Sequence, residues 1–256
     1  MILEEFDPTK DAVYNAYDCE ERIEGFPKVG ISCFSTVTLE KLISSFDYKI
    51  IARTAFANLE IPIYEIEHKG TKIAVFNAYV GAAGCIALIE DLFAMGLEKL
   101  VLFGTCGVLD GTIGDCSIVI PDSAIRDEGT SYHYMAASDE VKVNEKYIDD
   151  FKQFLDEREI SYTVGKVWTT DGLYRETREK VKRRKSQGCI CVDMECSAVA
   201  ALASFRDKDV LHFFYAADNL DAEEWDTRSL ANNDNLDEKH KIASIALEMA
   251  VRISDN

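Results

Sequence analysis

The sequence predicts a single-domain α/β protein with a twisted, mixed and largely parallel central sheet flanked by helices. Three observations carry this prediction: strand-like and helix-like segments alternate from residue 28 onward, no long linker interrupts them, and residues 71–103 form a complete strand–helix–strand unit. The chain has 256 residues, of which 47% are hydrophobic, which is enough for a sizeable core. We therefore expect residues 1–256 to form one domain, with residues 1–27 as an N-terminal extension whose structure the sequence does not indicate.

The strand–helix–strand unit begins with a β-branched and aromatic run from Thr71 to Val80. A turn rich in glycine and alanine, residues 81–84, leads into an amphipathic helix that Gly96 is well placed to end. Lys99 to Phe103 then form a short buried strand. Because a single crossover connects them, we expect the two strands to be parallel neighbours.

The later segments repeat this alternation. The basic run from Lys180 to Lys185 reads as the solvated face of a helix, and a strand from Cys189 leads straight into a helix of small residues. The remaining periodic segments predict two helices, around residues 147–158 and 236–253, and two strands, around residues 162–168 and 210–216.

Composition excludes several classes of function. The formal net charge of −18 argues against a nucleic-acid-binding protein, because phosphate contacts need clustered lysine and arginine. The N-terminus lacks the basic and apolar regions of a signal peptide, and no apolar run reaches the roughly 18 residues of a membrane span. We therefore expect a cytoplasmic protein without a membrane partner, whose eight cysteines are reduced. The four histidines show no pattern of metal ligation, and no metal is expected.

Three predicted strands end in residues able to do chemistry. Residues 104–107, Gly-Thr-Cys-Gly, place a hydroxyl between two glycines that allow a sharp turn, although an ordinary tight turn has the same pattern. Asp193 and Glu195 stand where a strand meets a helix, so one is suited to capping the helix and the other to accepting hydrogen bonds from a vicinal diol. Asp218 ends an apolar strand, which makes it either a turn residue or a general acid with a raised pKa.

Together these segments resemble the nucleoside phosphorylase superfamily, which includes purine nucleoside phosphorylases, uridine phosphorylases and related nucleosidases. The resemblance runs from about Val29 to the final helix and is most specific at residues 193–198, which are similar to the ribose-binding signature of the family. Residues 104–107 resemble its glycine-flanked loop, which touches phosphate and lies under the base. Residues 126–134 resemble a stretch of the uridine phosphorylase branch, and residues 170–174 resemble the segment that forms a wall beside the base.

The resemblance implies a role for each matched side chain. Glu195 would bind the ribose hydroxyls, Asp218 would protonate the leaving base as in the purine enzymes, and Thr105 would contact phosphate. His133 would either reach the 5′-hydroxyl of a nucleoside or form hydrogen bonds within its own loop. The other residues implied to line the nucleoside site are Met194, Asp193, Cys106, Gly107, Leu173 and Tyr174.

The phosphate site departs from the family pattern. The family has a Gly-Asp-Pro-x-Arg loop after its first strand, whereas residues 30–35 here read Gly-Ile-Ser-Cys-Phe-Ser and contain no arginine. Gly30 and Arg53 remain as candidates for phosphate binding, with Ser32 or Ser35 as a hydroxyl donor, and Arg126 is a weaker candidate. For Arg53, a surface salt bridge is an equally good interpretation.

The resemblance thus implies a pentosyltransferase that cleaves the N-glycosidic bond of a purine ribonucleoside, with phosphate as co-substrate and no other cofactor. It also implies a homo-oligomer, a dimer, trimer or hexamer, because family members commonly complete their sites across dimer contacts. Uridine phosphorylases generally lack an acid equivalent to Asp218, which favours a purine base. A uridine phosphorylase, a hydrolytic nucleosidase and a non-catalytic nucleoside-binding protein remain as alternatives, and a dinucleotide-dependent dehydrogenase ranks last because the sequence has no Gly-x-Gly-x-x-Gly after an early strand.

Overall fold

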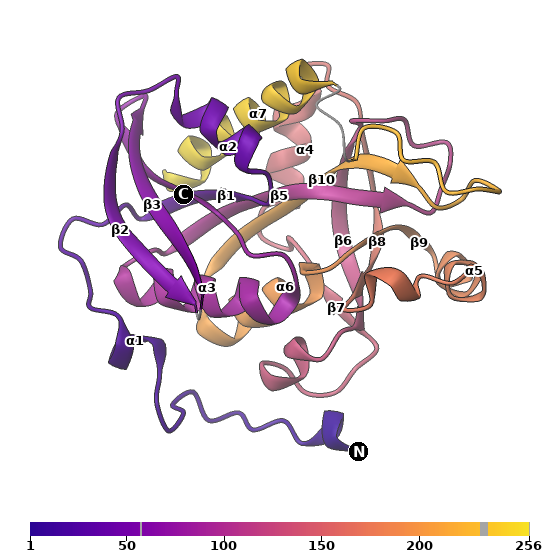
Figure 1. The fold of residues 1–256 in the computed structure, drawn as a ribbon, viewed down its shortest axis with the longest axis horizontal. Coiled ribbons are helices and arrows are strands. Elements are labelled where there is room, and N and C mark those ends of the chain that lie inside the picture. The colour runs from indigo at the N-terminus through magenta and orange to yellow at the C-terminus, as the bar shows by residue number, and fades with distance from the viewer. Residues whose placement is uncertain (57, 231–234, 256) are drawn as a thin grey trace.

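A computed structural model describes residues 1–56, 58–230 and 235–255. One mixed sheet runs through the molecule, with helices on both of its sides (Figure 1). The strands are β1 (Val29–Cys33), β2 (Lys49–Phe56), β3 (Leu59–His68), β4 (Thr71–Asn77), β5 (Lys99–Val108), β6 (Ile118–Asp127), β7 (Glu140–Lys142), β8 (Tyr162–Thr170), β9 (Cys189–Asp193) and β10 (Asp209–Asn219). The α-helices are α1 (Ala16–Cys19), α2 (Thr36–Ile43), α3 (Ala82–Met95), α4 (Ile148–Asp156), α5 (Arg178–Ser186), α6 (Cys196–Arg206) and α7 (Leu236–Ser254).

The strand order is β10-β6-β8-β9-β5-β1-β4-β3-β2, and β10 also pairs with β5. Strands β5, β10, β6, β8 and β9 therefore form a closed ring, from which the other strands extend as an open sheet. Among the pairings of the described strands, five are parallel and five antiparallel, so the sheet is more evenly mixed than the sequence suggested. Two antiparallel pairs come from the run β2–β3–β4, two come from the ring (β10–β6 and β5–β9), and the fifth joins β7 to β6.

Residues 71–103 form the expected strand–helix–strand unit, but its two strands are not neighbours in the sheet, as the sequence had suggested they would be. Helix α3 begins after Gly81 and ends at Gly96, both of which have a positive φ that favours glycine. Strands β4 and β5 are parallel but not adjacent, because β1 lies between them and pairs with both. The crossover helix thus spans one intervening strand, and nothing in the local sequence of residues 71–103 reveals this.

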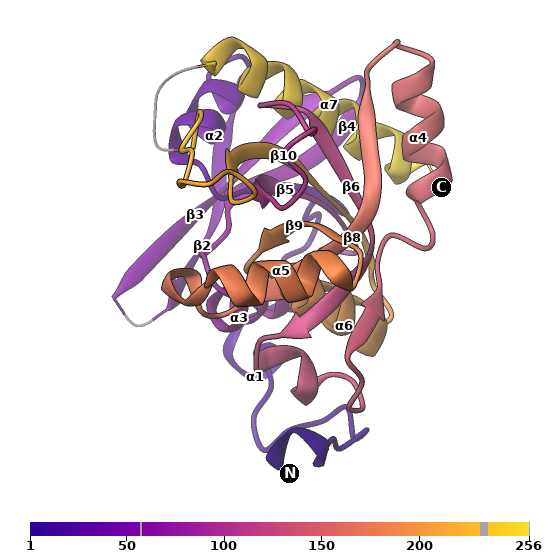
Figure 2. The same cartoon turned by 90° about the vertical axis from the view of Figure 1, so that its right-hand side faces the viewer.

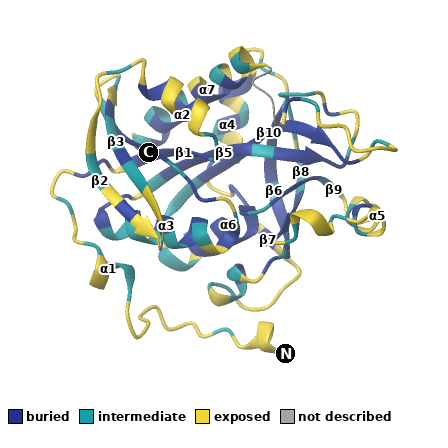
Figure 3. Ribbon diagram, viewed as in Figure 1, coloured by how far each residue is buried: buried dark blue, intermediate teal, exposed yellow. Residues whose placement is uncertain are grey.

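Two helical layers cover the sheet. Figure 1 shows α2, α4 and α7 above it and α3 and α6 below it. The upper layer buries one apolar core that includes Ile31, Phe103, Phe213 and Met249, and the lower layer buries a second that includes Phe76 and Leu92. The central strands are correspondingly dark in the burial view of Figure 3, whereas β2 and the N-terminal segment are mostly exposed. Helix α5 lies outside both layers, in front of β9 in the view of Figure 2.

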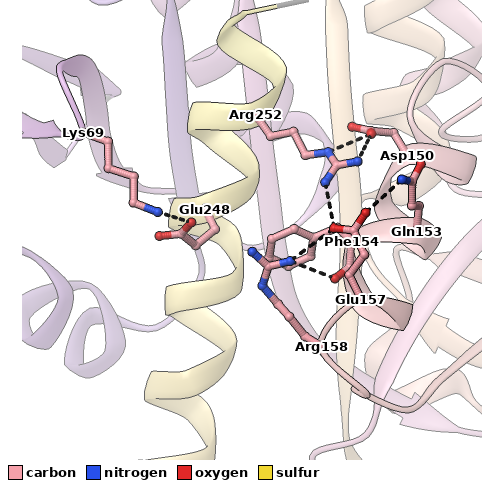
Figure 4. A network of polar contacts seen from close by, with 8 residues as sticks. All are labelled: Lys69, Asp150, Gln153, Phe154, Glu157, Arg158, Glu248 and Arg252. Atoms are coloured by element: carbon pink, nitrogen blue, oxygen red, sulfur yellow. Dashed lines mark hydrogen bonds and ion pairs between the residues drawn. The ribbon is translucent and has the colours of Figure 1, made fainter.

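Polar contacts fix α7 to its neighbours at the rim of the core (Figure 4). Arg252 donates from Nε to Asp150 on α4 at 2.7 Å, and Glu248 accepts from Lys69 at 2.6 Å. The N-terminal extension packs along the opposite layer, where the Ile23 N–H donates to the Met95 carbonyl at the end of α3. Both ends of the chain are therefore held against the same domain.

Candidate active site

A cavity of about 140 Å³ opens where β5, β9 and β10 end. We call it the central cavity. It brings together eight of the residues singled out from the sequence, namely Thr105, Cys106, Gly107, Leu173, Asp193, Met194, Glu195 and Asp218. Phe34, Val80, Glu176, Val192, Leu220 and Leu230 complete its wall. Three sequence segments that lie far apart along the chain therefore meet at one place, as ligand sites do at the strand ends of α/β sheets.

Residues 104–107 do not form the sharp turn that their glycines suggested. They continue β5, in which Gly104 and Thr105 pair with Phe214 and Tyr215 of β10. Glycine is needed here for close packing: a Cβ on Gly104 would lie 2.6 Å from the Phe34 ring. The strand therefore carries the Thr105 hydroxyl into the cavity on a rigid backbone.

Gly107 allows a second close approach, because a Cβ there would lie 2.5 Å from Leu220 and 3.0 Å from Oδ1 of Asp218. We expect Gly107→Ala to lower the free energy of unfolding by about 1–3 kcal/mol through overpacking, and to reduce turnover by displacing Asp218. Urea unfolding and an activity assay would measure both effects. Gly129→Ala is the matched control, since its nearest neighbour lies 4.0 Å away at φ −90°. Equal behaviour of the two variants would contradict the packing argument.

Glu195 is held at the junction of β9 and α6. Its side chain is only 5% exposed, and its Oε1 accepts the Gly81 N–H at 2.5 Å. Burial raises the pKa of Glu195, the nearby Asp193 raises it further, and the Gly81 N–H opposes both. Glu195 is thus a positioned carboxyl that a ligand donating hydrogen bonds would shift toward its charged form.

Asp193 caps the helix, which was the simpler interpretation of its position. Its Oδ2 accepts the backbone N–H groups of Glu195 at 2.8 Å and Cys196 at 2.6 Å, and its Oδ1 accepts the Thr169 hydroxyl at 2.7 Å. Burial raises the pKa of Asp193, whereas these hydrogen bonds act in the opposite direction. Asp193 therefore positions the backbone that carries Glu195, although it also lines the cavity.

A buried network behind this junction was not anticipated from the sequence. The Ser197 N–H donates to Thr169 Oγ1 at 3.0 Å, and the Ser197 hydroxyl donates to Glu128 Oε1 at 2.9 Å. Glu128 in turn accepts the Ser131 N–H at 2.9 Å. Residues 126–134, which resembled the uridine phosphorylase branch, thus support α6 from behind, and that resemblance was the only available signal for Glu128.

Asp218 lies at an irregularity near the end of β10, where the register with β5 shifts after Ala216. It is 8% exposed, and its Oδ2 accepts the indole N–H of Trp225 at 2.8 Å. Burial raises the pKa of Asp218, while the Trp225 hydrogen bond lowers it. A carboxyl in this state can hold a proton that it later gives to a ligand.

Glu176 is the cavity residue that the sequence analysis missed. It follows the short 3₁₀ helix Leu173–Arg175, and it lines both the central cavity and an adjoining outer cavity of about 530 Å³ that also contains Asp218, Tyr174 and Trp225. Burial and the neighbouring Asp218 raise the pKa of Glu176 to about 7. Glu176 lies just beyond residues 170–174, where that resemblance to the family ends, so no motif indicated its role.

The raised pKa of Glu176 predicts how stability depends on pH. The folded protein holds this proton up to about pH 7, whereas the unfolded chain loses it near 4.5. The stabilisation is complete below pH 4.5 and is lost as the pH rises toward 7, at no more than about 1.4 kcal/mol per pH unit. We expect Glu176→Gln to make the free energy of unfolding less dependent on pH in this window. Glu179→Gln, on the exposed side of α5, should leave the profile unchanged, and an identical slope in wild type and Glu176→Gln would contradict the assignment.

The remaining candidate nucleoside contacts lie further out. Tyr174 is 93% exposed and lines the outer cavity but not the central one. His133 is exposed in the short 3₁₀ helix Thr130–His133 and lines neither of these cavities. Within this chain, neither side chain is brought to Glu195.

The residues predicted to bind phosphate do not lie together in the structure. Thr105 lines the central cavity and also a side cavity of about 300 Å³, which shares Phe34 and Leu230 with it. Gly30 and Ser32 lie inside β1, where a Cβ on Gly30 would come within 3.0 Å of Leu97 and where Ser32 is fully buried. The structure therefore brings Thr105 to both cavities and Ser35 to the side cavity, whereas Gly30 and Ser32 line neither.

The two arginine candidates are engaged elsewhere. Arg53 is exposed on β2 and forms an ion pair with Glu60 at 2.6 Å. Arg126 is buried and donates to Ser131 and to the Ala136 carbonyl, both at 2.8 Å. Arg126 thus holds the loop that follows β6, and Arg53 matches the surface salt bridge considered from the sequence.

The side cavity offers other groups in their place. Its lining includes the hydroxyls of Ser35, Thr38 and Thr105, together with Lys239 on the first turns of α7. Lys239 is 6% exposed and donates to the Ser229 carbonyl at 2.8 Å. Ser35 caps α2, so the N-terminus of that helix also faces this region.

Within residues 1–56, 58–230 and 235–255, no three His, Cys, Asp or Glu side chains are grouped as a metal site requires. In the same part of the chain, no helix combines the length and the apolar character needed to cross a membrane.

Fold and cavity together define an α/β protein with a buried acidic site at the ends of its central strands. The sequence profile of the phosphorylase superfamily matches residues 28–253, and the chain belongs to that superfamily. A guanosine phosphorylase from Halorubrum lacusprofundi is 24% identical over 199 residues, covering 78% of this chain and 80% of that protein. This confirms the family expected from the sequence.

Solved structures have the same fold. A uridine phosphorylase from Vibrio fischeri has a TM-score of 0.75 at 19% identity, covering 91% of this chain and 95% of its own. A purine nucleoside phosphorylase from Toxoplasma gondii in complex with immucillin-H has a TM-score of 0.75 at 17% identity, covering 97% and 98%. The predicted α/β class with a mixed sheet is thereby confirmed.

Proposed function

We propose that this chain is a nucleoside phosphorylase that cleaves the N-glycosidic bond of purine ribonucleosides with phosphate, giving free base and ribose 1-phosphate. The observation that carries the proposal is that Glu195 and Asp218 line one cavity, together with Met194 and Thr105. The names of its relatives, which include guanosine, purine nucleoside and uridine phosphorylases, agree with this reaction.

The chemistry of glycosidic cleavage suits these groups. The sugar gains positive charge and the base gains negative charge as the bond breaks. Glu195 would accept hydrogen bonds from the ribose diol and oppose the first charge, while Asp218 would give its proton to the base and relieve the second. Burial raises the pKa of Asp218, which favours its protonated form.

We assign the phosphate co-substrate to the side cavity. The cavity adjoins the sugar position at Thr105. Ser35 provides a hydroxyl donor, whose oxygen accepts the Thr38 hydroxyl at 3.0 Å, and Lys239 provides a cation. Arg53 would reach phosphate only across a contact between copies of the chain. An assembly of this kind, a dimer, trimer or hexamer, remains part of the proposal and is testable by sedimentation. We also propose that the protein acts in the cytoplasm.

Base release in the presence and absence of phosphate tests the reaction. We expect free base to form from inosine, adenosine or guanosine only when phosphate is present, together with an equal amount of ribose 1-phosphate. Lys239→Met should raise the KM for phosphate, whereas Lys241→Met on the exposed side of the same helix should not. Equal base release in both buffers would leave a hydrolytic nucleosidase as the function.

Two alternatives have distinct outcomes in this assay. A uridine phosphorylase would release uracil faster than any purine base, and Asp218 would then have no role in protonation. A non-catalytic nucleoside-binding protein would bind nucleosides without releasing base. The position of Asp218 in the cavity favours catalysis, because binding alone does not need an acid for a leaving group.

A further inference from the structure

A second cavity, which we call the rear cavity, lies behind α6 at the start of β10. It has a volume of about 250 Å³ and is lined by residues 142–146, by one side of α6 and by Lys208, Asp209, Val210 and His212. Asp218, at the other end of β10, lines the central cavity and not this one. The rear cavity is therefore separate from the site described above.

His212 is the unusual residue in its wall. It is 1% exposed, and neither ring nitrogen has a hydrogen-bond partner among the residues that the structure describes. Buried polar groups without partners are rare and point to a water or ligand that completes them. Burial lowers the pKa of His212 to about 3, so the ring is neutral and offers one donor and one acceptor.

The position of His212 is fixed by the structure around it. The Asn144 side chain holds the backbone of His212: its Oδ1 accepts the His212 backbone N–H at 2.8 Å, and its Nδ2 donates to the His212 backbone carbonyl at 2.7 Å. The ring lies 4.6 Å from that of Phe214, its neighbour on the same face of β10. This face is directed toward α6, whose Val199, Ala200 and Ala203 form the apolar side of the cavity.

The rim of the cavity is cationic in a protein whose net charge is −18. Lys142, Lys146 and Lys208 line it, against the carboxylates of Glu145 and Asp209. Lys146 forms an ion pair with Asp209 at 2.6 Å, whereas Lys142 and Lys208 form no ion pair within 4.0 Å in the described part of the chain. The Lys208 ammonium lies over the Phe93 ring, 5.5 Å from its centroid, and has no carboxylate within ion-pair distance among the described residues. Two ammonium groups without such a carboxylate partner suit a phosphate group, which carries up to two negative charges.

We propose that the rear cavity is a second ligand site that takes a small phosphate ester. The hydroxyl groups of the ester would form hydrogen bonds with the ring nitrogens of His212, and the phosphate of the ester would lie between Lys142 and Lys208. Cys196, the first residue of α6, lines this cavity and directly follows Glu195, which lines the central cavity, so the two sites are adjacent at the start of α6. A ligand here is therefore placed to influence the carboxyl that faces the central cavity.

Histidine NMR with ribose 5-phosphate as the probe tests the proposal. The chain has four histidines, and the His212 resonance is assigned by its loss in His212→Gln. We expect saturable shifts of this resonance at millimolar probe, with smaller shifts from ribose or inorganic phosphate alone. An unmoved His212 resonance would overturn the proposal, as would equal shifts with ribose lacking phosphate.

Variants at the rim separate this site from the central one. Lys142→Met combined with Lys208→Met should abolish the His212 shift while base release in the standard assay persists. Lys182→Met, an exposed position on α5, is the charge-matched control and should leave the shift intact. If the double variant still shows the full shift, the phosphate does not lie between these lysines and the proposal is wrong. Because the NMR readout does not depend on turnover, it remains decisive even if the proposed reaction fails.

Discussion

Asp218→Asn is expected to lower kcat for purine nucleosides by about 10²–10⁴-fold, the range typical of losing a general acid. Asparagine keeps the size of the side chain and an oxygen that can accept the Trp225 indole N–H, but it cannot give a proton to the departing base. Nucleoside affinity should change far less, because only the transition state needs that proton. Steady-state kinetics together with a direct binding measurement would separate the two effects.

A control variant and a second substrate show whether the effect of Asp218→Asn comes from the loss of proton transfer to the base. Asp139→Asn, at an exposed position outside the cavity, should match wild type in both measurements. A nucleoside with a more acidic leaving base should be affected less by Asp218→Asn, because such a base needs less protonation. Unchanged turnover in the variant would remove Asp218 from the mechanism and would favour the uridine phosphorylase or binding-protein alternatives.

Glu195→Gln is expected to lower kcat/KM by about 10²–10³-fold, comparable to losing one electrostatic contact in the transition state. The amide still fills the space beside Gly81 but carries no negative charge to oppose the charge that develops on the sugar. It also replaces one acceptor oxygen with a donor that faces the ribose diol. The loss should therefore be larger for ribonucleosides than for 2′-deoxyribonucleosides, which lack one of the two hydroxyls.

The ratio between these two substrates is the informative measurement. Wild type should prefer the ribonucleoside, and Glu195→Gln should reduce that preference. Glu179→Gln serves as the control for charge removal at an exposed site. A uniform loss on both substrates, accompanied by a lower melting temperature, would mean that Glu195 acts on the fold of the junction and not on the diol.

Sequence patterns predicted the parts of this protein that depend on neighbours along the chain. The boundaries of α3 follow from Gly81 and Gly96, and β9 leads into α6 at Asp193 as expected. The junction at Glu195 and the end of β10 at Asp218 were recognisable because each places acidic residues where an apolar strand stops. The family, and with it the mixed α/β fold, followed from the same segments.

Other features depended on which strands became neighbours. The insertion of β1 between β4 and β5 placed Phe34 against Gly104, and closure of the ring placed Leu220 against Gly107. These contacts explain glycines that look like turn residues in the sequence. The same packing brought Glu176 into the cavity and left Arg53 with Glu60, and neither outcome has a local signal.

The sequence by itself thus determined the boundaries of α3, the junction of β9 with α6, the family, and the residue types available for chemistry. Periodicity, capping and glycine conformation act over a few residues, so they can be read from adjacent positions. The tertiary structure alone decided which side chains share the central cavity, which arginines are used in structural contacts, and that His212 is buried beside a rim of lysines. These outcomes depend on contacts between residues far apart in the chain, which are set by strand order and by the packing of helices on both sides of the sheet.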